Sequence, residues 1–331
     1  MLIENNTITN VARSGIFLTG LWGNRPEKGW GKNEYVSDGE NWWPHKDVVI
    51  KGNYIDEVAG DGIVVIGTEG TLIEHNTVYR INTNPVTPCA NAGIWPQSSN
   101  NCIIQYNEVA YANKPKDCAD AQAFDVDAAC RNTVIQYNYS HDNTGGFLLL
   151  CESDNIKDEH GFRGTVVRNN ISVNDGEGEL MALVGPVRGA LIENNTFITS
   201  DWVMRLINVW TEDNQNQAKD VKVRKNIFIS NGADNDFNLE NGEDFVFEGN
   251  LYWGAHRTPR EDEVSPIIAD PLIETPAKAY EGFESVSKYI PKEGSPAYNS
   301  DILPLCPADE DILKNKTDGA SYVGAIFQRE N

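Results

Sequence analysis

The sequence of 331 residues predicts a single-stranded right-handed parallel β-helix, an all-β solenoid of about nine coils. Three observations predict this fold. A short motif containing asparagine recurs along most of the chain, its copies are spaced by slightly more than twenty residues or by that period plus an insertion, and a second short apolar segment follows most copies. Long helical patterns are scarce, which agrees with an all-β fold.

The repeated motif has two mostly apolar residues, two polar residues and an asparagine that precedes another short strand. It occurs as LIENNTI, VIKGNYI, LIEHNTV, IIQYNEV, VIQYNYS, VVRNNIS, LIENNTF, KVRKNIF and VFEGNLY. The asparagines are Asn6, Asn53, Asn76, Asn107, Asn138, Asn170, Asn195, Asn226 and Asn250, separated by 47, 23, 31, 31, 32, 25, 31 and 24 residues. A period of this length fits the right-handed β-helix, because left-handed ones repeat in hexapeptides. We expect each asparagine to take the left-handed backbone conformation at a corner and to join a ladder of stacked side-chain amides.

The second segment of each repeat should form a strand with one face outside the solenoid. These segments are SGIFLTG, DGIVVIG, AGIWPQS, QAFDVDA, GGFLLLC, ELMALVG, VMRLINV and NDFNLEN. Because side chains on a strand alternate between its two faces, Phe124 and Val126 should point inward and their neighbours outward. The stacked coils should then form two outward columns. One is Phe17, Val64, Trp95, Asp125, Leu148, Ala182, Arg205 and Asn238, and the other is Thr19, Ile66, Gln97, Asp127, Leu150, Val184, Ile207 and Glu240.

Two aspartates in the middle of these columns are the candidates for catalysis. Asp125 and Asp127 lie in the stretch DCADAQAFDVDAACRN, although aspartate is a poor strand former. Their predicted outward neighbours are unusually apolar for a surface, which is typical of a groove that contacts a ligand. Asp120 lies just before the strand and is a third candidate.

The spacing of these carboxylates suits glycosidase chemistry. Residues i and i+2 of a strand lie roughly 6.6 Å apart at Cα, and glycosidases hold their carboxyl pairs about 5–5.5 Å or about 6.5–9.5 Å apart. Two carboxylates about 6 Å apart at an effective dielectric constant near 20 repel by roughly 2.8 kcal/mol, or about two pKa units. This repulsion would keep one carboxyl protonated as a general acid. The alternatives are that the aspartates are solvated surface residues or ligands of Ca²⁺; no other cofactor is expected.

Further site residues are expected around the aspartates. His141 and Glu152 are candidates to assist catalysis, although His141 could equally be a turn residue that bonds local backbone. Tryptophan rings suit the C–H faces of sugars, and several tryptophans lie in one long insertion. The candidates for substrate binding are Trp95, Gln97, Arg205, Trp42, Trp43 and His160.

The C-terminal part of the sequence resembles the ending of many bacterial right-handed β-helix proteins. The resemblance is carried by "ADP" and "GSPA" within IIADPLIETPAKAYEGFESVSKYIPKEGSPAYNSD, and by the "GA-aromatic" ending of DGASYVGAIFQ. With the repeats, it places the chain in the pectate-lyase-like superfamily, which implies action on carbohydrate as a lyase, hydrolase, epimerase or binding protein. The separation of seven residues between Asp120 and Asp127 is also similar to that of the catalytic aspartate pair of lacto-N-biosidase-type β-helix hydrolases.

The repeats divide the chain into two parts. We expect the β-helix over residues 1–254, with a tryptophan-rich insertion at 21–47, and an irregular closing segment over residues 255–331 that packs on the helix. The chain begins in the middle of a repeat, so we expect an N-terminal cap to be missing, and a signal peptide could have been lost with it.

Charge and composition limit the partners. A net charge of −22 argues against nucleic acid and anionic membranes, and no apolar run is long enough to insert into a membrane. The six cysteines lack a CxxC spacing; some could pair across neighbouring coils, or all could be buried thiols. We expect a monomer, extracellular or periplasmic, whose partner is an oligosaccharide or polysaccharide.

The favoured function is hydrolysis of a glycosidic bond in a complex or host glycan. The first alternative is a polysaccharide lyase or epimerase acting on uronates, which needs a base and a positive groove. The second is a glycan-binding solenoid without catalysis, such as an adhesin. The scarcity of basic residues in the outward columns ranks the hydrolase first.

Overall fold

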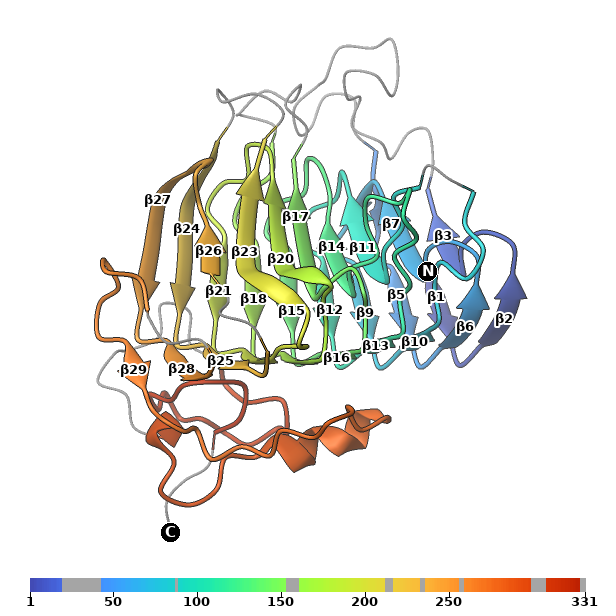
Figure 1. The fold of residues 1–331 in the computed structure, drawn as a ribbon. Helices are drawn as coiled ribbons and strands as arrows, with labels where there is room; N and C mark the ends of the chain where they lie inside the picture. Colours follow the sequence, from blue (N-terminus) through green and yellow to red (C-terminus); the bar gives the residue numbers. More distant parts are fainter. Residues whose placement is uncertain are drawn as a thin grey trace.

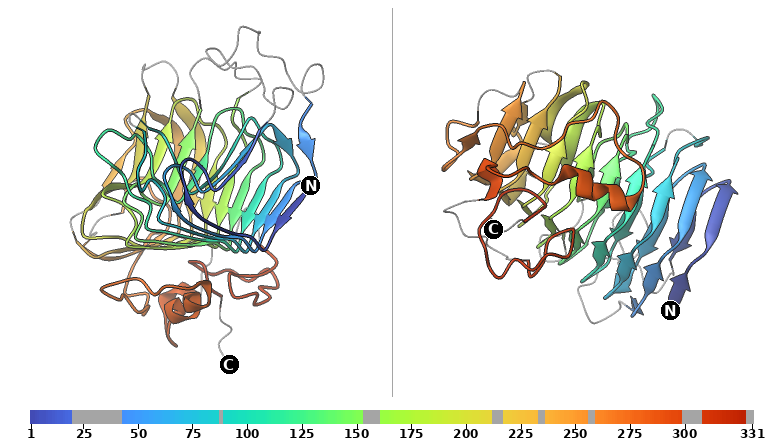
Figure 2. Two further views of the ribbon diagram at one scale, coloured as in Figure 1. Left: turned by 90° about the vertical axis from the view of Figure 1, so that its right-hand side faces the viewer. Right: turned by 90° about the horizontal axis from the view of Figure 1, so that it is seen from below.

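The computed structural model describes residues 1–19, 43–86, 89–152, 161–211, 217–232, 236–255, 259–298 and 308–327. Within them, three long sheets of parallel strands run side by side along the molecule (Figures 1 and 2). We call these sheets A, B and C. A coil passes through the three sheets in turn, and sheet A contains nine strands. The right-handed parallel β-helix of about nine coils that the repeat predicts is confirmed.

The strands are short because each coil turns corners between the sheets. Sheet A contains β1 (Leu2–Glu4), β5 (Val49–Lys51), β9 (Leu72–Glu74), β12 (Ile103–Gln105), β15 (Val134–Gln136), β18 (Val166–Arg168), β21 (Leu191–Glu193), β24 (Ala218–Arg224) and β27 (Gly242–Glu248). Sheet B contains β2 (Thr7–Val11), β6 (Tyr54–Val58), β10 (Thr77–Tyr79), β13 (Glu108–Ala110), β16 (Tyr139–His141), β19 (Ile171–Val173), β22 (Thr196–Ile198), β25 (Ile227–Ser230), β28 (Leu251–Gly254) and β29 (Ile267–Ile268). Sheet C contains β3 (Ile16–Leu18), β7 (Ile63–Ile66), β11 (Ile94–Gln97), β14 (Phe124–Val126), β17 (Leu148–Cys151), β20 (Gly178–Val184), β23 (Val203–Trp210) and β26 (Asp236–Asn238). A small separate sheet pairs β4 (His45–Lys46) with β8 (Thr68–Glu69), and two short 3₁₀ helices, η1 (Phe283–Tyr289) and η2 (Pro296–Tyr298), lie near the C-terminus.

The repeated asparagines form the expected ladder at the corner between sheets A and B. In every step from Asn6 to Asn250, the side-chain Nδ2 of one asparagine donates to Oδ1 of the next, at 2.8–3.0 Å. Asn250 donates in turn to Oε1 of Glu263 at 2.8 Å, which ends the ladder with an acceptor. The ladder satisfies polar groups that burial would otherwise leave without partners.

The left-handed backbone conformation lies one residue earlier than the sequence predicts. In each motif the residue just before the ladder asparagine has a positive φ: Asn5, Gly52, His75, Tyr106, Tyr137, Asn169, Asn194, Lys225 and Gly249. The prediction for the asparagine itself is therefore wrong. The corner residue turns the chain, and the asparagine that follows faces inward, where its amide can bond both neighbouring coils.

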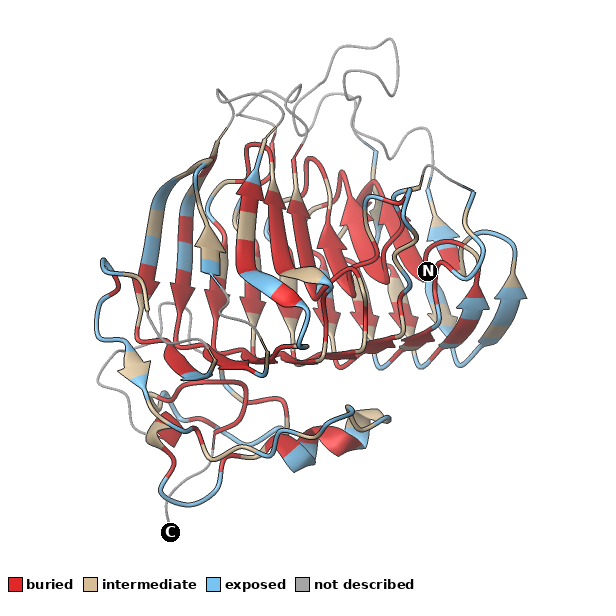
Figure 3. Cartoon of the chain, in the orientation of Figure 1, coloured by how far each residue is buried: buried red, intermediate tan, exposed pale blue. Residues whose placement is uncertain are grey.

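Apolar side chains from all three sheets fill the interior. The core includes Ile63, Phe124 and Val126 of sheet C, all without exposed surface, as alternation predicts (Figure 3). The predicted outward columns are correct over the first coils and at Ala182, Val184 and Asn238, and they are wrong at β17 and β23. Leu148 and Leu150 pair with Phe124 and Val126 and point into the core, so Leu149 takes the outward place beside Asp125.

The outward columns shift once more at β23. The pairing of β20 with β23 is irregular after Gly178, and it aligns Ala182 with Asn208 and Val184 with Trp210. Asn208 and Trp210 therefore occupy the outward positions that the sequence predicts for Arg205 and Ile207. Ile207 is instead a core residue.

The C-terminal segment covers the outer face of sheet B (Figures 1 and 2). Val286, Tyr289, Val323 and Ile326 pack there in one apolar cluster with residues of β16, β19, β22, β25 and β28. The uncovered first strand of the sheet, β2, stays largely exposed. Among the residues that the structure describes, no helix has the length and apolar character needed to cross a lipid bilayer.

Candidate active site on sheet C

Asp125 stands on the outer face of sheet C, at the centre of β14. The residues on either side of it, Phe124 and Val126, belong to the core, so its carboxylate points away from the interior. Asp125 is nevertheless only 5% exposed, and its Oδ1 has no hydrogen-bond partner among the residues that the structure describes. The sequence therefore predicts its direction correctly but not its burial.

Asp127 follows β14 and lies on the same side. Its Oδ2 accepts a hydrogen bond from Nε2 of Gln97 at 3.2 Å, and its Oδ1 accepts one from the backbone N–H of Ala128 at 2.7 Å. Both donors favour the ionised form of this carboxyl. Gln97, predicted as a substrate-binding residue, is 3% exposed and holds the aspartate.

Asp120 approaches the same place from the loop before β14. The next residue, Ala121, has φ +134°, a conformation that alanine rarely adopts. Gly145 of the following coil packs directly against it: a methyl group added to Gly145 would lie 2.3 Å from the carbonyl carbon of Ala121. Strained backbone held by tight packing is typical of functional sites, where it fixes a side chain.

Burial raises the pKa values of all three aspartates, and the charges of neighbouring aspartates raise those of Asp120 and Asp125 further. Burial, together with the charge of Asp127, raises the pKa of Asp120 to about 6. Burial also raises the pKa of Asp127 to about 6, against the lowering effect of the Ala128 N–H. The pKa of Asp125 is raised well above its ordinary value, first by burial and then by the charges of Asp127 and Asp120. The cluster therefore takes up protons at a higher pH than isolated aspartates would.

A fourth aspartate, Asp61, belongs to this neighbourhood, and no pattern in the sequence pointed to it. It is fully buried, and its Oδ1 accepts hydrogen bonds from Nε1 of Trp95 at 3.0 Å and from the backbone N–H of Ala92 at 3.2 Å. Its charge contributes to the raised pKa of both Asp120 and Asp125. Trp95, expected to meet substrate, packs with Val64, Ile66 and Ala92 in a small apolar cluster outside the core and is 8% exposed.

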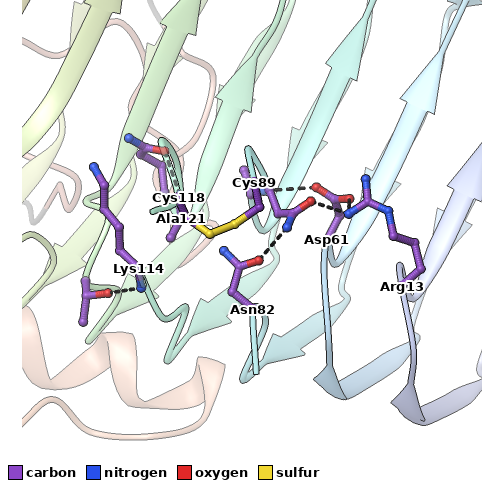
Figure 4. The surroundings of a disulfide bond; sticks show 11 residues. Arg13, Asp61, Asn82, Cys89, Lys114, Cys118 and Ala121 are labelled. Carbon is purple, nitrogen blue, oxygen red and sulfur yellow. Dashed lines mark hydrogen bonds and ion pairs between the residues drawn. A yellow bond between two sulfur atoms is a disulfide. The ribbon is translucent and has the colours of Figure 1, made fainter. Parts of the chain in front are cut away.

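A disulfide fixes the loop that carries Asp120 (Figure 4). Cys89 and Cys118 come from neighbouring coils and are bonded to each other, two residues before Asp120. The backbone N–H of Ala119 also donates to the carbonyl of Cys89 at 2.8 Å. Of the two possibilities that the sequence left open, pairing across coils is correct for these two cysteines, while Cys102, Cys130 and Cys151 keep their thiols. Cys306 lies outside the described residues.

His141 lies on another sheet, away from the aspartate cluster. It ends β16 of sheet B and is fully buried; its Nε2 bonds Glu108 at 3.1 Å and its Nδ1 bonds Asp142 at 2.8 Å. Although burial lowers the pKa, the two carboxylates outweigh it and raise the value to about 9. Glu108 also accepts the backbone N–H of Gly282 at 2.7 Å, so this ion cluster ties the C-terminal segment to sheet B. The expectation that His141 lies near Asp120 is wrong, because the chain turns another corner before it reaches sheet C.

Glu152 lies one coil beyond Asp127 and contacts backbone amides. It is 3% exposed, and its Oε2 accepts hydrogen bonds from the backbone N–H groups of Ala129, at 3.1 Å, and Phe162. The carboxylate therefore holds two loops together beside the cluster. Cys151 lies in the outward column between Asp127 and Val184, a place that the sequence did not indicate. Burial, and then the charges of the aspartates, raise the pKa of its thiol.

The remaining expected binding residues lie further away or outside the described chain. Arg205 is exposed and donates from Nη1 to Oδ1 of Asn208 at 3.2 Å, and Trp43 is 72% exposed. Asn208 and Trp210, both on the outer face, were missed because of the shift in register. Trp42 and His160 lie outside the described residues.

The donor set gives no sign of a bound metal. Among the residues that the structure describes, no group of three or more His, Cys, Asp and Glu side chains has the arrangement to hold a metal ion.

Comparison with known proteins points to enzymes that act on glycans. No protein-family model matches the chain. A lacto-N-biosidase of Bifidobacterium longum subsp. longum is 28% identical over an alignment of 320 residues, which covers 85% of this chain and 19% of that protein. The chain thus spans about a fifth of the length of this relative.

Solved structures also match this chain. The structure of XylC with xylose matches 98% of this chain and 59% of its own at 14% identity and a TM-score of 0.55, which supports the fold alone. The GH136 lacto-N-biosidase of Eubacterium ramulus matches 62% of this chain and 29% of its own at 25% identity, with a TM-score of 0.40. The chain is a right-handed parallel β-helix whose sequence is similar, over most of its length, to part of a lacto-N-biosidase.

Proposed function

We propose that this chain carries the active site of a glycoside hydrolase, built from Asp120, Asp125 and Asp127 on the outer face of sheet C. The observation that carries the proposal is the group of three aspartates with raised pKa values on one buried strip of the β-helix. Similarity in sequence to a lacto-N-biosidase supports it, and that likeness covers most of this chain.

The environments of the aspartates suggest their roles. Asp127 accepts two hydrogen bonds that favour its charge, so it is the ionised carboxylate. Asp120, of intermediate exposure and with a pKa of about 6, is the group that can hold a proton and still reach a ligand. Asp125 is buried deepest and stays protonated beside Asp127, where its raised pKa keeps a second negative charge out of the cluster.

The reaction follows from these roles. Asp120 gives its proton to the oxygen of the leaving sugar while the bond between that oxygen and the anomeric carbon breaks. Asp127 either attacks the anomeric carbon or takes a proton from the water that does so. In both cases a hydroxyl group from water ends on the anomeric carbon, and both aspartates return to their starting states.

We propose an oligosaccharide of a complex or host glycan as the substrate, and an extracellular or periplasmic location. The glycan-acting relative supports the substrate class. The Cys89–Cys118 disulfide supports the location, because disulfides persist in oxidising compartments.

The test is turnover of a panel of oligosaccharides in isotopically labelled water, followed by mass spectrometry. A hydrolase places one labelled oxygen on the new reducing end, and each cleavage adds the mass of one water. Products with an unsaturated sugar and no added water would contradict the proposal and favour the lyase. Binding without cleavage of any oligosaccharide would favour the non-catalytic alternative.

A further inference from the structure

A cavity of about 330 Å³ lies at the corner between sheets B and C over the first three coils, and Cys89 of the disulfide lines it. Ala12, Ala59, Gly60 and Ala90 form much of its wall, with Val86 and Cys89. These side chains are small or absent, which leaves space in front of the backbone. The volume is at the lower end of the range of about 300–1,000 Å³ for small-molecule sites, so the cavity suits a ligand of one or two rings.

Two polar side chains, Arg13 and Asn91, reach the apolar wall. Nη1 of Arg13 donates to Oδ1 of Asn91 at 2.5 Å and lies 3.5 Å from the buried carboxylate of Asp61. Asn91 is 2% exposed and donates from Nδ2 to Oδ1 of Asn82 at 2.8 Å, so its position is fixed from behind. Guanidinium has five N–H donors, and the side-chain hydrogen bond and ion pair of Arg13 within the described chain both run through Nη1.

The cavity is joined to the aspartate cluster by two separate links. Asp61, paired with Arg13, also accepts the indole N–H of Trp95, which neighbours Asp125 on the outer face. Cys89, in the wall of the cavity, is bonded to Cys118, two residues before Asp120. A molecule in the cavity would therefore lie on the N-terminal side of the candidate catalytic groups.

We propose that this cavity is a binding subsite for one neutral sugar ring of the substrate, an inference that rests on the proposed function. Alanine and valine side chains offer an apolar wall for the C–H face of a sugar, and Arg13 and Asn91 offer donors and acceptors for its hydroxyl groups. The neighbouring carboxylate of Asp61 and the net charge of −22 disfavour an anionic polymer. The sugar in this subsite belongs to the part of the glycan that the aspartates do not attack.

The test is isothermal titration calorimetry with galactose, glucose, xylose and N-acetylglucosamine as separate probes. At least one of them is expected to bind the wild-type protein, and binding should be lost in Ala90→Phe, which fills the cavity, and weakened at least tenfold in Arg13→Ala. Ala277→Phe is the matched control, because Ala277 is exposed in the C-terminal segment and should tolerate the same added ring. Asp127→Asn should retain binding of the free sugar, which separates the subsite from the catalytic group.

The outcomes also separate this subsite from the proposed function. If no probe binds, or if binding survives both Ala90→Phe and Arg13→Ala, the subsite is refuted even when the protein hydrolyses oligosaccharides. If a probe binds in the predicted pattern but no oligosaccharide is cleaved, the hydrolase proposal fails and the subsite stands. Should Ala90→Phe not fold, Arg13→Ala alone decides, since this arginine side chain is largely exposed.

Discussion

At the scale of single residues, Asp125 carries an electrostatic cost in the folded protein. Burial and the charges of Asp127 and Asp120 raise its pKa well above the value of 3.8 that it has in the unfolded chain. The folded state therefore binds this proton more tightly, and the stability it contributes is present at low pH and is lost as pH rises through the folded pKa. An asparagine has no such proton to lose.

We therefore expect Asp125→Asn to raise the midpoint of thermal unfolding relative to wild type, by an amount that grows from pH 4 to pH 8. Circular dichroism melts of both proteins across that range measure it. A difference that is constant with pH would contradict the assignment of a raised pKa to Asp125. Asp117→Asn, an exposed change in the preceding loop, should show no such trend.

Gly145 is expected to position Asp120. The change Gly145→Ala would place a methyl group against the backbone of Ala121 and push the neighbouring Asp120 out of place. A displacement of about 1 Å at a catalytic group can lower turnover by about 10²-fold, so kcat should fall strongly while KM changes less. Gly232→Ala is the matched control, because its added methyl would lie equally close to backbone, 2.5 Å from Cα of Asp201. This contact is in a later coil, away from the candidate catalytic aspartates. Equal losses of kcat in both variants would indicate general destabilisation in place of positioning.

Single residues also show what the sequence could and could not predict about the site. Asp125 and Asp127 stood out because aspartate is unusual in a strand, and alternation placed Asp125 on the correct face. Asp61 gave no such signal, since it lies at a corner where alternation fails and its partners Arg13 and Trp95 come from other coils. His141 is close to the site along the chain, but the corner after β16 separates it from sheet C. Its side chain bonds Glu108, which also bonds the C-terminal segment.

At the scale of structural elements, the asparagine ladder is the feature that stabilises the stacked corners most evidently. Asn138 is fully buried; its Nδ2 donates to Asn170 and to the carbonyls of Ile104 and Gln136. Removing the side chain leaves several buried groups without partners, at about 1–3 kcal/mol each. We expect Asn138→Ala to lower the free energy of unfolding by more than about 3 kcal/mol, measured by urea denaturation.

The first residue of the ladder is the control for this prediction. Asn6 is exposed, and within the described residues its amide bonds a neighbouring coil on one side only, so Asn6→Ala should cost less than about 1 kcal/mol. Similar losses at both positions would mean that the ladder does not stabilise the fold through buried amide bonds.

Elements also explain why the register was predicted only in part. In β14 the apolar residues Phe124 and Val126 flank an aspartate, so alternation predicts its two faces. The run of three leucines in β17 has no such alternation, and the residue before it, Phe147, is also in the core. The pairing of β23 shifts register with both of its neighbours, β20 and β26. Alternation counted from the start of β23 therefore placed Arg205 and Ile207 in the outward columns, where Asn208 and Trp210 lie.

At the scale of the whole molecule, the outer faces of sheets B and C differ in the residues that they present. The C-terminal segment covers sheet B with aromatic and aliphatic contacts and with the ion cluster around His141. The outer strip of sheet C carries the aspartates, and the disulfide and the cavity adjoin it. The repeat predicts the solenoid because its period is visible in the sequence, whereas the choice of face depends on packing between distant segments.

The central claim is that Asp127 is the ionised catalytic carboxylate of a glycosidase. The most direct measurement is the rate of reducing-end release from a cleaved oligosaccharide by wild type, Asp127→Asn and the exposed control Asp117→Asn. We predict that Asp127→Asn lowers turnover by at least about 10²-fold with an unchanged fold, while Asp117→Asn keeps the wild-type rate. Turnover by Asp127→Asn at the rate of wild type would contradict the account.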